Sequence, residues 1–274
     1  LGVFLVAINV SFLPVPIIWL LSIAGAFVFG AAWAFIPAYL QAKRGSHVVI
    51  TTIMFNFIAS SLMVYLLVDV IRDMKQMGPH TVALPKEMWL PSFKDFAALF
   101  GIKIRYSPLN LSFLLAIVAS FFVWFLVWKT KWGYEMRAVG HNTQAAIYAG
   151  ISPYKNIIIA MLISGGLAGL LSINEILGVH HKIVSGFPAG YGFTGIAVAL
   201  MGRNHPIGIF PAAFLFGILY QGGSEVTFDM PNITRYMFVA VQGVIILFSG
   251  ALENLFRPQI ESFFVNRLNK EVEA

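Results

Sequence analysis

The chain contains no cysteine, and only 11% of its 274 residues are charged. The lack of cysteine excludes disulfides, a thiolate nucleophile and a cysteine-ligated zinc site, and it leaves the redox compartment open. A soluble domain carries roughly a quarter charged residues. Because 58% of this chain is hydrophobic, too little polar surface remains for a shell in contact with water. These absences exclude an ordinary soluble protein and indicate that the lipid bilayer is its solvent.

Sequence motifs for catalysis and nucleotide binding are also missing. The chain has no G-x-x-x-x-G-K-[ST] P-loop, no H-E-x-x-H and no G-x-S-x-G. Residues 190–195 fit G-x-G-x-x-G by letter, but no predicted strand precedes them, so we reject a dinucleotide site. His180 and His181 are adjacent and would point about 100° apart on a helix, which favours solvated loop histidines over a metal pair. We therefore expect no enzyme activity, no cofactor and no metal in this chain, and its net charge of +6 does not require nucleic acid.

Long apolar runs are what the chain has in place of these motifs. A helix that crosses a bilayer needs about 20 mostly apolar residues. The apolar run at residues 186–202 is shorter than this length and rich in glycine, which favours a discontinuous or re-entrant helix. After an apolar N-terminal fragment, the other runs predict membrane spans at residues 17–42, 48–70, 109–128, 154–177, 207–222 and 233–252, with a charged tail from residue 253.

The fold class that follows is an all-α integral membrane protein, a polytopic transmembrane helix bundle with one discontinuous segment. We expect residues 1–274 to form a single transmembrane domain. Because the sequence starts at Leu1 inside an apolar run that lacks the features of a signal peptide, we also expect that N-terminal helices are missing from it.

Two polar segments connect these spans on opposite sides of the membrane. Residues 72–108 carry four prolines and mixed charges, and we expect them to form an extracytoplasmic loop. Residues 130–153 lie on the other side together with Lys43 and Arg44, and this side carries slightly more Lys and Arg than the first. By the positive-inside rule we place it in the cytoplasm.

The cytoplasmic loop, residues 130–153, predicts a short helix. Asn142 is a preferred N-cap residue, residues 143–149 form the helix body, and Gly150 suits the left-handed C′ position. Ser152 and Pro153 predict the N-cap and the first position of the next span. A short helix held between two spans indicates either a docking surface for a soluble partner or an ordinary interfacial helix, and the residues leave both open.

Small side chains in this short helix would suit the docking alternative. Ala145, Ala146, Ala149 and Gly150 would allow close approach of another protein. Tyr148 would then anchor the helix in an apolar cleft of that partner.

Polar residues inside the spans are candidates for a conduction path, because a polar side chain in lipid is costly and normally faces the bundle interior or a water-filled cavity. Thr52, Asn56 and Ser60 recur every four residues and share one helix face. Hydrogen bonding between helices is the alternative role for them. Glu175 lies near the outer end of its apolar run, and it is either a gate residue near the outer vestibule or a residue exposed at the interface.

Glycines are concentrated in the same run as Glu175. Gly165, Gly166 and Gly169 allow helices to approach closely, so the pattern favours a role in packing. A hinge for alternating access is the alternative.

Three stretches of the chain carry recognisable patterns. Residues 137–151 read RAVGHNTQAAIYAGI and fit R-A-x-G-x-N-x-x-A-A-x-x-x-G-I, residues 192–206 read GFTGIAVALMGRNHP, and residues 49–56 read VITTIMFN. Together these stretches resemble the permease subunits of ATP-binding-cassette (ABC) importers for simple sugars and nucleosides, especially the branch that serves nucleoside-binding lipoproteins. The resemblance runs from about residue 30 to about residue 250 and includes three patterns in the right order, which is far more specific than any one of them.

The resemblance implies roles for individual residues. Residues 137–151 are similar to the family's cytoplasmic coupling segment, which implies ATPase-coupling roles for Arg137, Gly140, Asn142, Ala145, Ala146, Gly150 and Ile151. We assign the translocation path to Thr52, Asn56, Ser60, Glu175 and Phe193.

The resemblance also implies partners. These are a separate ABC ATPase subunit that binds ATP in the cytoplasm, a second permease chain in a heterodimer, and an extracytoplasmic solute-binding lipoprotein. The expected function is that of a multi-pass permease subunit of the cell membrane, which forms the path for a nucleoside or a simple sugar. An ion-coupled secondary transporter or a channel is the alternative: the first would need intramembrane charges, and the second would conduct without ATP.

Overall fold

The computed structural model describes residues 1–9, 13–72, 78–94, 109–186, 190–230, 237–245 and 247–248. Within these ranges the chain is helical, and its extended pairing is limited to the isolated bridges His80–Val184 and Ser92–Asn110. An all-α membrane protein was predicted, and this is confirmed. The chain divides into two compact units, residues 1–187 and residues 188–274, and each is described by itself. The single transmembrane domain stays a prediction.

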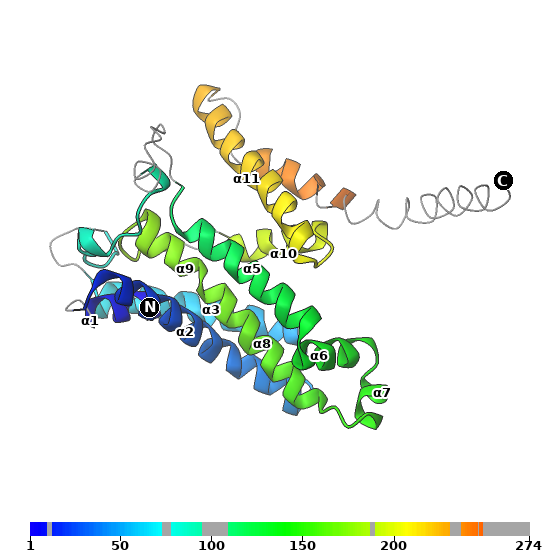
Figure 1. Ribbon diagram of the computed structural model, residues 1–274. Helices are drawn as coiled ribbons and strands as arrows, with labels where there is room; N and C mark the ends of the chain where they lie inside the picture. The colour runs from blue at the N-terminus through cyan, green and yellow to red at the C-terminus, as the bar shows by residue number, and fades with distance from the viewer. Residues whose placement is uncertain are drawn as a thin grey trace, which may run out of the picture. The chain divides into compact units, whose positions relative to one another are not determined.

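The first unit holds most of the helices (Figure 1). Their bounds are α1 Gly2–Asn9, α2 Val15–Arg44, α3 Val48–Tyr65, the π-helix η1 Leu66–Val70, the 3₁₀-helix η2 Lys86–Met88, α5 Ser112–Lys129, α6 Lys131–His141, α7 Thr143–Tyr148, α8 Pro153–Gly169, α9 Leu171–Ile173 and the π-helix η3 Asn174–Val179. The second unit contains α10 Tyr191–Met201 and α11 Pro206–Asp229.

Five helical stretches in the described residues are long and apolar enough to cross a membrane, and they confirm five of the predicted spans. Residues 237–245 and 247–248 are helical and lie inside the sixth, whose other residues are outside the described ranges, as is the charged tail. With 11 residues, α10 is shorter than a membrane span, as predicted for residues 186–202. The five stretches are Val15–Arg44, Val48–Val70, Ser112–Lys129, Pro153–Val179 and Pro206–Thr227.

Local sequence sets the two ends of α2. The helix begins at Val15, two residues earlier than predicted, because Pro16 occupies its first turn, where a proline needs no amide hydrogen bond. It ends at Gly45, whose φ of 65° lies in the left-handed region. The Gly45 amide donates to the carbonyl of Gln41, and this turn leads directly into α3.

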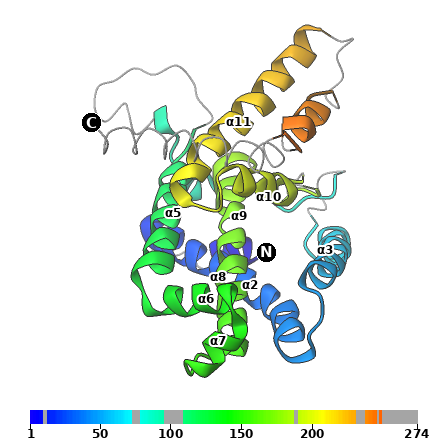
Figure 2. The same cartoon turned by 90° about the vertical axis from the view of Figure 1, so that its right-hand side faces the viewer.

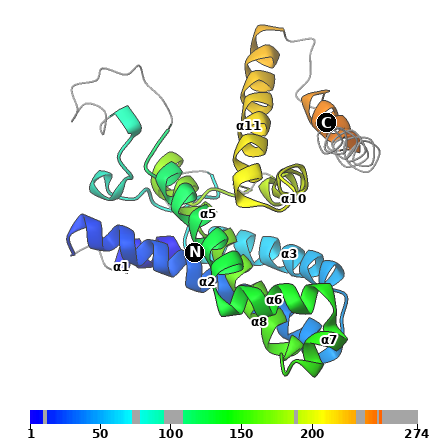
Figure 3. The same ribbon diagram turned by 45° about the vertical axis from the view of Figure 1, so that its right-hand side comes forward.

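The closest helix contact in the first unit is the glycine seam, which we define as Gly30 of α2 with Gly165 and Gly169 of α8. A Cβ on Gly30 would overlap the Gly165 carbonyl, and a Cβ on Gly169 would overlap the carbonyl of Ala26. The helices therefore touch backbone to backbone along the seam, and Figures 1 and 3 show α8 lying against α2. Gly165 and Gly169 form a G-x-x-x-G spacing, and the predicted packing role is confirmed.

The part of the predicted extracytoplasmic loop that the structure describes, residues 78–94, folds back onto the end of the Pro153–Val179 span. The Leu90 amide donates to the Leu177 carbonyl at 3.0 Å, and the Leu84 amide donates to the His181 carbonyl at 2.8 Å. Leu84 and Met88 are buried in the core of the first unit, with residues of α1, α9 and η3. The segment is therefore held by both hydrogen bonds and apolar burial.

His181 differs from the solvated loop histidine that was predicted. Its ring stacks on Trp89, with the ring centroids 3.6 Å apart and the planes inclined by 6°. Burial lowers the pKa of His181, and the charge of His180 lowers it further, while a hydrogen bond to the Leu177 backbone only partly offsets these effects. The lowered pKa favours the neutral imidazole, which stacks on the Trp89 indole.

We expect this stack to weaken in acid. Because the folded pKa of His181 lies below the ordinary value of 6.5, the unfolded segment binds the proton more tightly. The stabilisation is therefore present above pH 6.5 and is lost as the pH falls through 6.5 toward the folded pKa. Hydrogen exchange of residues 78–94 should accelerate between about pH 7.5 and about pH 5.5, after correction for intrinsic exchange, and His181→Gln should remove this acceleration. If His181→Gln changes this acceleration no more than the control His47→Gln does, the stack of His181 on Trp89 does not cause the pH dependence.

Candidate functional site

A sharp corner joins α5 to α6 on the predicted cytoplasmic side. The Thr130 hydroxyl donates to the Leu126 carbonyl at 2.6 Å and accepts from the Gly133 amide at 3.2 Å, which caps α6. A Cβ on Gly133 would overlap the backbone carbonyls of Leu126 and Val127. Only glycine lets α6 turn this closely past the end of α5, and Figure 2 shows α6 crossing there with α7 beyond it.

Helix α6, Lys131–His141, was not predicted. The sequence there is polar and includes Gly133 and Gly140, two residues with poor helix propensity. Of the predicted coupling residues it carries Arg137 and Gly140, both exposed. Arg137 donates through Nε to the Gly133 carbonyl at 3.4 Å, and a Cβ on Gly140 would meet no atom within 4 Å.

The predicted short helix is confirmed as α7, and it is fixed at both ends. The Asn142 Oδ1 accepts from the amides of Gln144 and Ala145 at 3.0 and 3.1 Å. Gly150 has a φ of 77° and donates to the Ile147 carbonyl, while the Ile151 amide donates to the Ala146 carbonyl, each at 2.9 Å. This pair of bonds is a Schellman motif, which requires a left-handed residue at Gly150.

The caps of α7 give a prediction of their own. Replacing Asn142 with alanine should destabilise α7 by about 1 kcal/mol, and replacing Gly150 with valine by at least as much, since a β-branched residue resists positive φ. Hydrogen exchange at the amides of residues 143–151 should rise in both variants. Thr143→Ala is the control, because the Thr143 hydroxyl donates to the Val139 carbonyl and does not cap an amide at the start of α7. Equal protection in all three variants would contradict the capping account.

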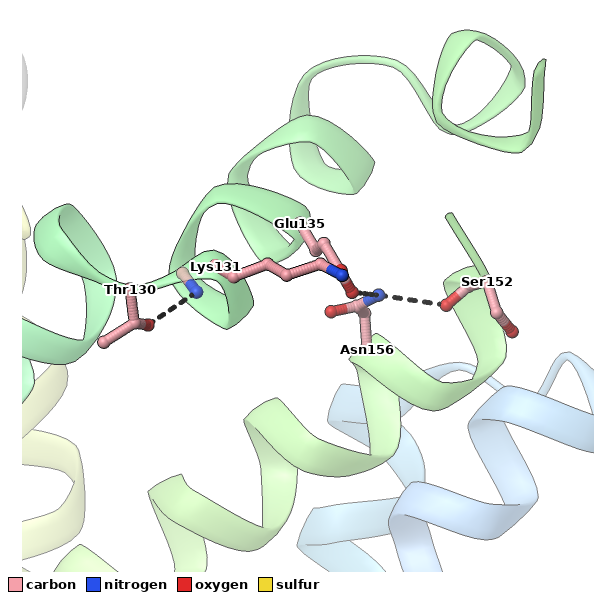
Figure 4. A network of polar contacts seen from close by, with 6 residues as sticks. Thr130, Lys131, Glu135, Ser152 and Asn156 are labelled. Atoms are coloured by element: carbon pink, nitrogen blue, oxygen red, sulfur yellow. Dashed lines mark hydrogen bonds and ion pairs between the residues drawn. The ribbon is translucent and has the colours of Figure 1, made fainter. Parts of the chain in front are cut away.

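A polar contact ties α6 to the first turn of α8 (Figure 4). Asn156, only 4% exposed, donates through Nδ2 to Glu135 Oε2 at 3.4 Å and to the Ser152 carbonyl at 3.1 Å. Glu135 also faces Lys131, with Oε1 3.8 Å from Nζ. Because Glu135 is on α6 and Asn156 is on α8, the contact closes the loop that carries α7. Neither residue was predicted, since their separation of 21 positions follows no local pattern.

The accessible surface of α7 includes fewer of the predicted small residues than the sequence suggested. Tyr148 is 92% exposed and Ile147 is 51% exposed, and Ala145 is exposed beside them. Ala146 is only 3% exposed, so its side chain packs inside the chain and cannot take part in a close approach. We call three exposed residues of this helix, Ala145, Ile147 and Tyr148, the α7 tip; the predicted small residues Ala149 and Gly150, which follow it, are exposed as well.

A cavity of about 360 Å³ lies among α2, α3 and α8. The predicted path residues Thr52 and Asn56 line it, whereas Ser60, on the same helix, is outside its lining. Its other lining residues are Gly30, Trp33, Ala34, Pro37, Phe55, Met161, Ser164, Gly165, Ala168 and Gly169. The glycine seam is therefore part of its wall. The aromatic and α8 members were not predicted, because they come together only through helix packing.

Two other predicted path residues lie elsewhere. Phe193 is on α10 in the second unit, where it is 69% exposed. Glu175 lies in η3 and is 6% exposed, so the alternative of an exposed interfacial residue is wrong. Its carboxylate accepts from Asn174 Nδ2 at 3.1 Å and lies 3.4 Å from His180 Nε2.

Glu175 belongs to a polar cluster that joins η3 to the start of α5. Asn174 Oδ1 accepts from Asn110 Nδ2 at 3.0 Å and from the Ser112 hydroxyl at 2.8 Å. The cluster occupies a π-helix, a form that often marks functional sites. Its partners hold Glu175 in place at the outer end of the span, apart from the cavity lining.

These features define a polytopic helical membrane protein with a largely apolar cavity, into whose lining Thr52, Asn56 and Ser164 bring polar groups, and with a short capped helix between two spans. The family model described as "Branched-chain amino acid transport system / permease component" matches residues 1–250, and the chain belongs to this family of membrane permease components. The predicted family of ABC transporter permeases is thereby confirmed.

Named relatives fall within the same class of protein. The chain is 36% identical to the guanosine ABC transporter permease protein NupP of Bacillus subtilis over 83% of this chain and 63% of that protein. It is 32% identical to the glucose ABC transporter permease protein TsgB13 of Haloferax volcanii over 96% of this chain and 69% of that protein. It is 35% identical to the nucleoside ABC transporter permease protein NupB of Lactococcus lactis over 78% of this chain and 59% of that protein. The chain thus spans about three-fifths of the length of two of these relatives, and no solved structure matches it significantly.

Proposed function

We propose that this chain is the permease subunit of an ABC importer in the cell membrane, that it forms part of the path for a nucleoside or a simple sugar, and that a separate ATPase supplies the energy. The observation that carries the proposal is α7, a helix capped at both ends that projects the exposed Tyr148 between two spans. A soluble partner needs such a rigid, solvent-accessible contact to transmit force.

The connection from α7 to the membrane supports the coupling role. The Glu135–Asn156 contact joins α6 to α8 on both sides of α7. From there α8 runs along the glycine seam, and its residues Ser164 and Gly165 line the cavity. A displacement of the α7 tip would therefore be transmitted through α8 to the wall of the cavity, because packed helices shift as units.

The relatives support a heterodimer of two permease chains. In Bacillus subtilis both NupP and NupQ are similar to this chain, and in Lactococcus lactis both NupB and NupC are. Each pair bears the same transport description, guanosine in the first case and nucleoside in the second. On this basis the chain pairs with a different but related permease, and an extracytoplasmic lipoprotein delivers the solute.

The rival function, ion-coupled secondary transport, needs a charged group on the substrate path. No residue that lines the described cavity is charged, and Glu175 is engaged with Asn174 and His180 outside it. The sequence contains no P-loop, and this supports the proposal that a partner subunit binds ATP.

Uptake in cells tests the proposal. Cells with and without this gene should differ in uptake of labelled nucleosides or of glucose, and loss of the ATPase subunit should abolish that difference. Collapse of the ion gradient at a constant ATP level should leave uptake in place. Uptake that continues after loss of the ATPase but stops when the ion gradient is collapsed would instead establish a secondary transporter.

A further inference from the structure

Helix α5 has two faces that differ in the size of their side chains. Bulky apolar residues recur along it at alternating intervals of four and three positions, so they share one face. Each of them is exposed, from 36% for the last to 63% for the third. We call these five residues the α5 stripe: Leu114, Val118, Phe121, Phe125 and Trp128.

The small residues of α5 lie on the opposite face. Ala116, Ala119 and Ser120 gather there together with Ser112. The Ser112 hydroxyl donates to Asn174 Oδ1 of η3 at 2.8 Å, so this face is turned toward the rest of the first unit. Helices in a bilayer approach one another through small residues, as the glycine seam does. The α5 stripe contains no glycine, alanine or serine, and lipid acyl chains fit it better than another helix does.

A lysine stands at the end of the α5 stripe. Lys129 is the last residue of α5, and its Nζ lies 5.7 Å from the centroid of the Trp124 ring. The ammonium group therefore points back along the span and not outward past its end. Among the described residues it forms no ion pair. A charge beside lipid is costly unless a counter-charge meets it, and the headgroup region of the bilayer begins where a span ends.

The turn into α6 adds a second positive charge and another aromatic ring. The Lys131 side chain is 86% exposed, and its contact with Glu135 at 3.8 Å is a weak surface pair. Trp132 is 57% exposed, and tryptophan is enriched at the level of the lipid headgroups. The Thr130 cap and the close contact of Gly133 with the end of α5 hold this corner in place (Figure 2).

From these observations we propose that the α5–α6 corner binds an anionic phospholipid, with its acyl chains along the α5 stripe and its phosphate at the Lys129 ammonium. Residues 112–141 carry Lys129, Lys131 and Arg137 against a single acidic residue, Glu135. A zwitterionic lipid brings its own positive charge to this basic corner, whereas a lipid with a net negative charge complements it. The inference goes beyond the proposed function and does not depend on the transported solute.

A fluorescent label on the α5 stripe tests the inference. Because the chain contains no cysteine, Phe125→Cys gives a single labelling site one turn before Lys129 in the full chain, reconstituted in phosphatidylcholine vesicles. Dibrominated phosphatidylglycerol should quench the label at lower mole fractions than dibrominated phosphatidylcholine. Lys129→Gln should raise the mole fraction of phosphatidylglycerol for half-maximal quenching about fivefold, since one lysine near an anionic surface contributes about that factor. Lys129→Arg should keep the parent value.

The matched control is Lys155→Gln. Lys155 is also an exposed lysine near the end of a span, but its helix α8 packs against α2 along the glycine seam. Its half-maximal mole fraction should stay within about twofold of the parent value. Equal shifts in Lys155→Gln and Lys129→Gln would indicate a diffuse surface charge and would overturn the inference. So would equal quenching by the two lipids, or a label that neither lipid quenches, because protein would then cover the α5 stripe. The proposed function is untouched by these outcomes, since no transport is measured.

Discussion

Replacing Gly165 with valine is expected to disrupt the packing of α2 against α8 and to cause the largest loss of stability of any single change considered. A Cβ at Gly165 would lie 2.8 Å from the Gly30 carbonyl oxygen and would overlap the Cβ of Ala34. Both obstacles belong to the backbone or to a side chain that cannot rotate away, so the helices must move apart. Overpacking of this kind costs about 3 kcal/mol, which corresponds to a fall of about 10 °C in the midpoint of thermal unfolding.

Thermal unfolding of the purified protein in detergent measures this effect. Gly217→Val is the matched control, because Gly217 is also inside a membrane-length helix and a Cβ there meets no described atom within 4 Å. Gly30→Val should behave like Gly165→Val, since its Cβ would overlap the Gly165 carbonyl. Equal midpoints for Gly165→Val and Gly217→Val would contradict the role assigned to the glycine seam.

Replacing Tyr148 with alanine is expected to weaken binding of the ATPase subunit by about 30-fold or more. Tyr148 is 92% exposed at the tip of a helix that is capped at both ends, so a partner can bury the whole ring without reorganising the helix. Truncation of a buried interface tyrosine typically costs about 2 kcal/mol or more. Ala145→Glu should have a comparable effect, because it would place an unpaired charge in the same contact.

Co-purification and titration of the ATPase against the membrane-embedded chain measure this loss. Tyr134→Ala provides a matched control, because Tyr134 is also an exposed tyrosine of the predicted cytoplasmic loop, 62% exposed, but it lies on α6 and not in the α7 tip. Its affinity for the ATPase should stay within about twofold of the parent value. An unchanged affinity in Tyr148→Ala, with normal membrane insertion, would remove the α7 tip from the coupling interface.

Local chemistry explains which parts of the coupling segment could be predicted from the sequence. Asn142 and Gly150 bracket α7 because an Asn cap and a left-handed glycine act within a few residues of themselves. Helix α6 could not be predicted in the same way, because Gly133 is unfavourable in an isolated helix and is required only by its contact with the end of α5. Likewise the burial of Ala146 depends on how α7 packs on the rest of the chain.

The cavity illustrates the same division between local and tertiary information. Thr52 and Asn56 could be named because their four-residue spacing places them on one helix face. Trp33 and Ser164 could not, because they reach the cavity from α2 and α8, which meet through the glycine seam. Glu175 was recognised as unusual from its position in an apolar run, but the hydrogen bonds from Asn110 and Ser112 to Asn174 of η3 join residues that are 64 and 62 positions apart and follow no local pattern.

The most direct test of the account is solute flux into proteoliposomes that contain this chain and its partner permease, with and without the ATPase subunit. Under the proposed function we expect flux only when the ATPase, ATP and the solute-binding lipoprotein are all present, because the proposal has a separate ATPase supply the energy through the α7 tip. Flux that proceeds without the ATPase, whether down the solute gradient or driven by an ion gradient, would contradict it.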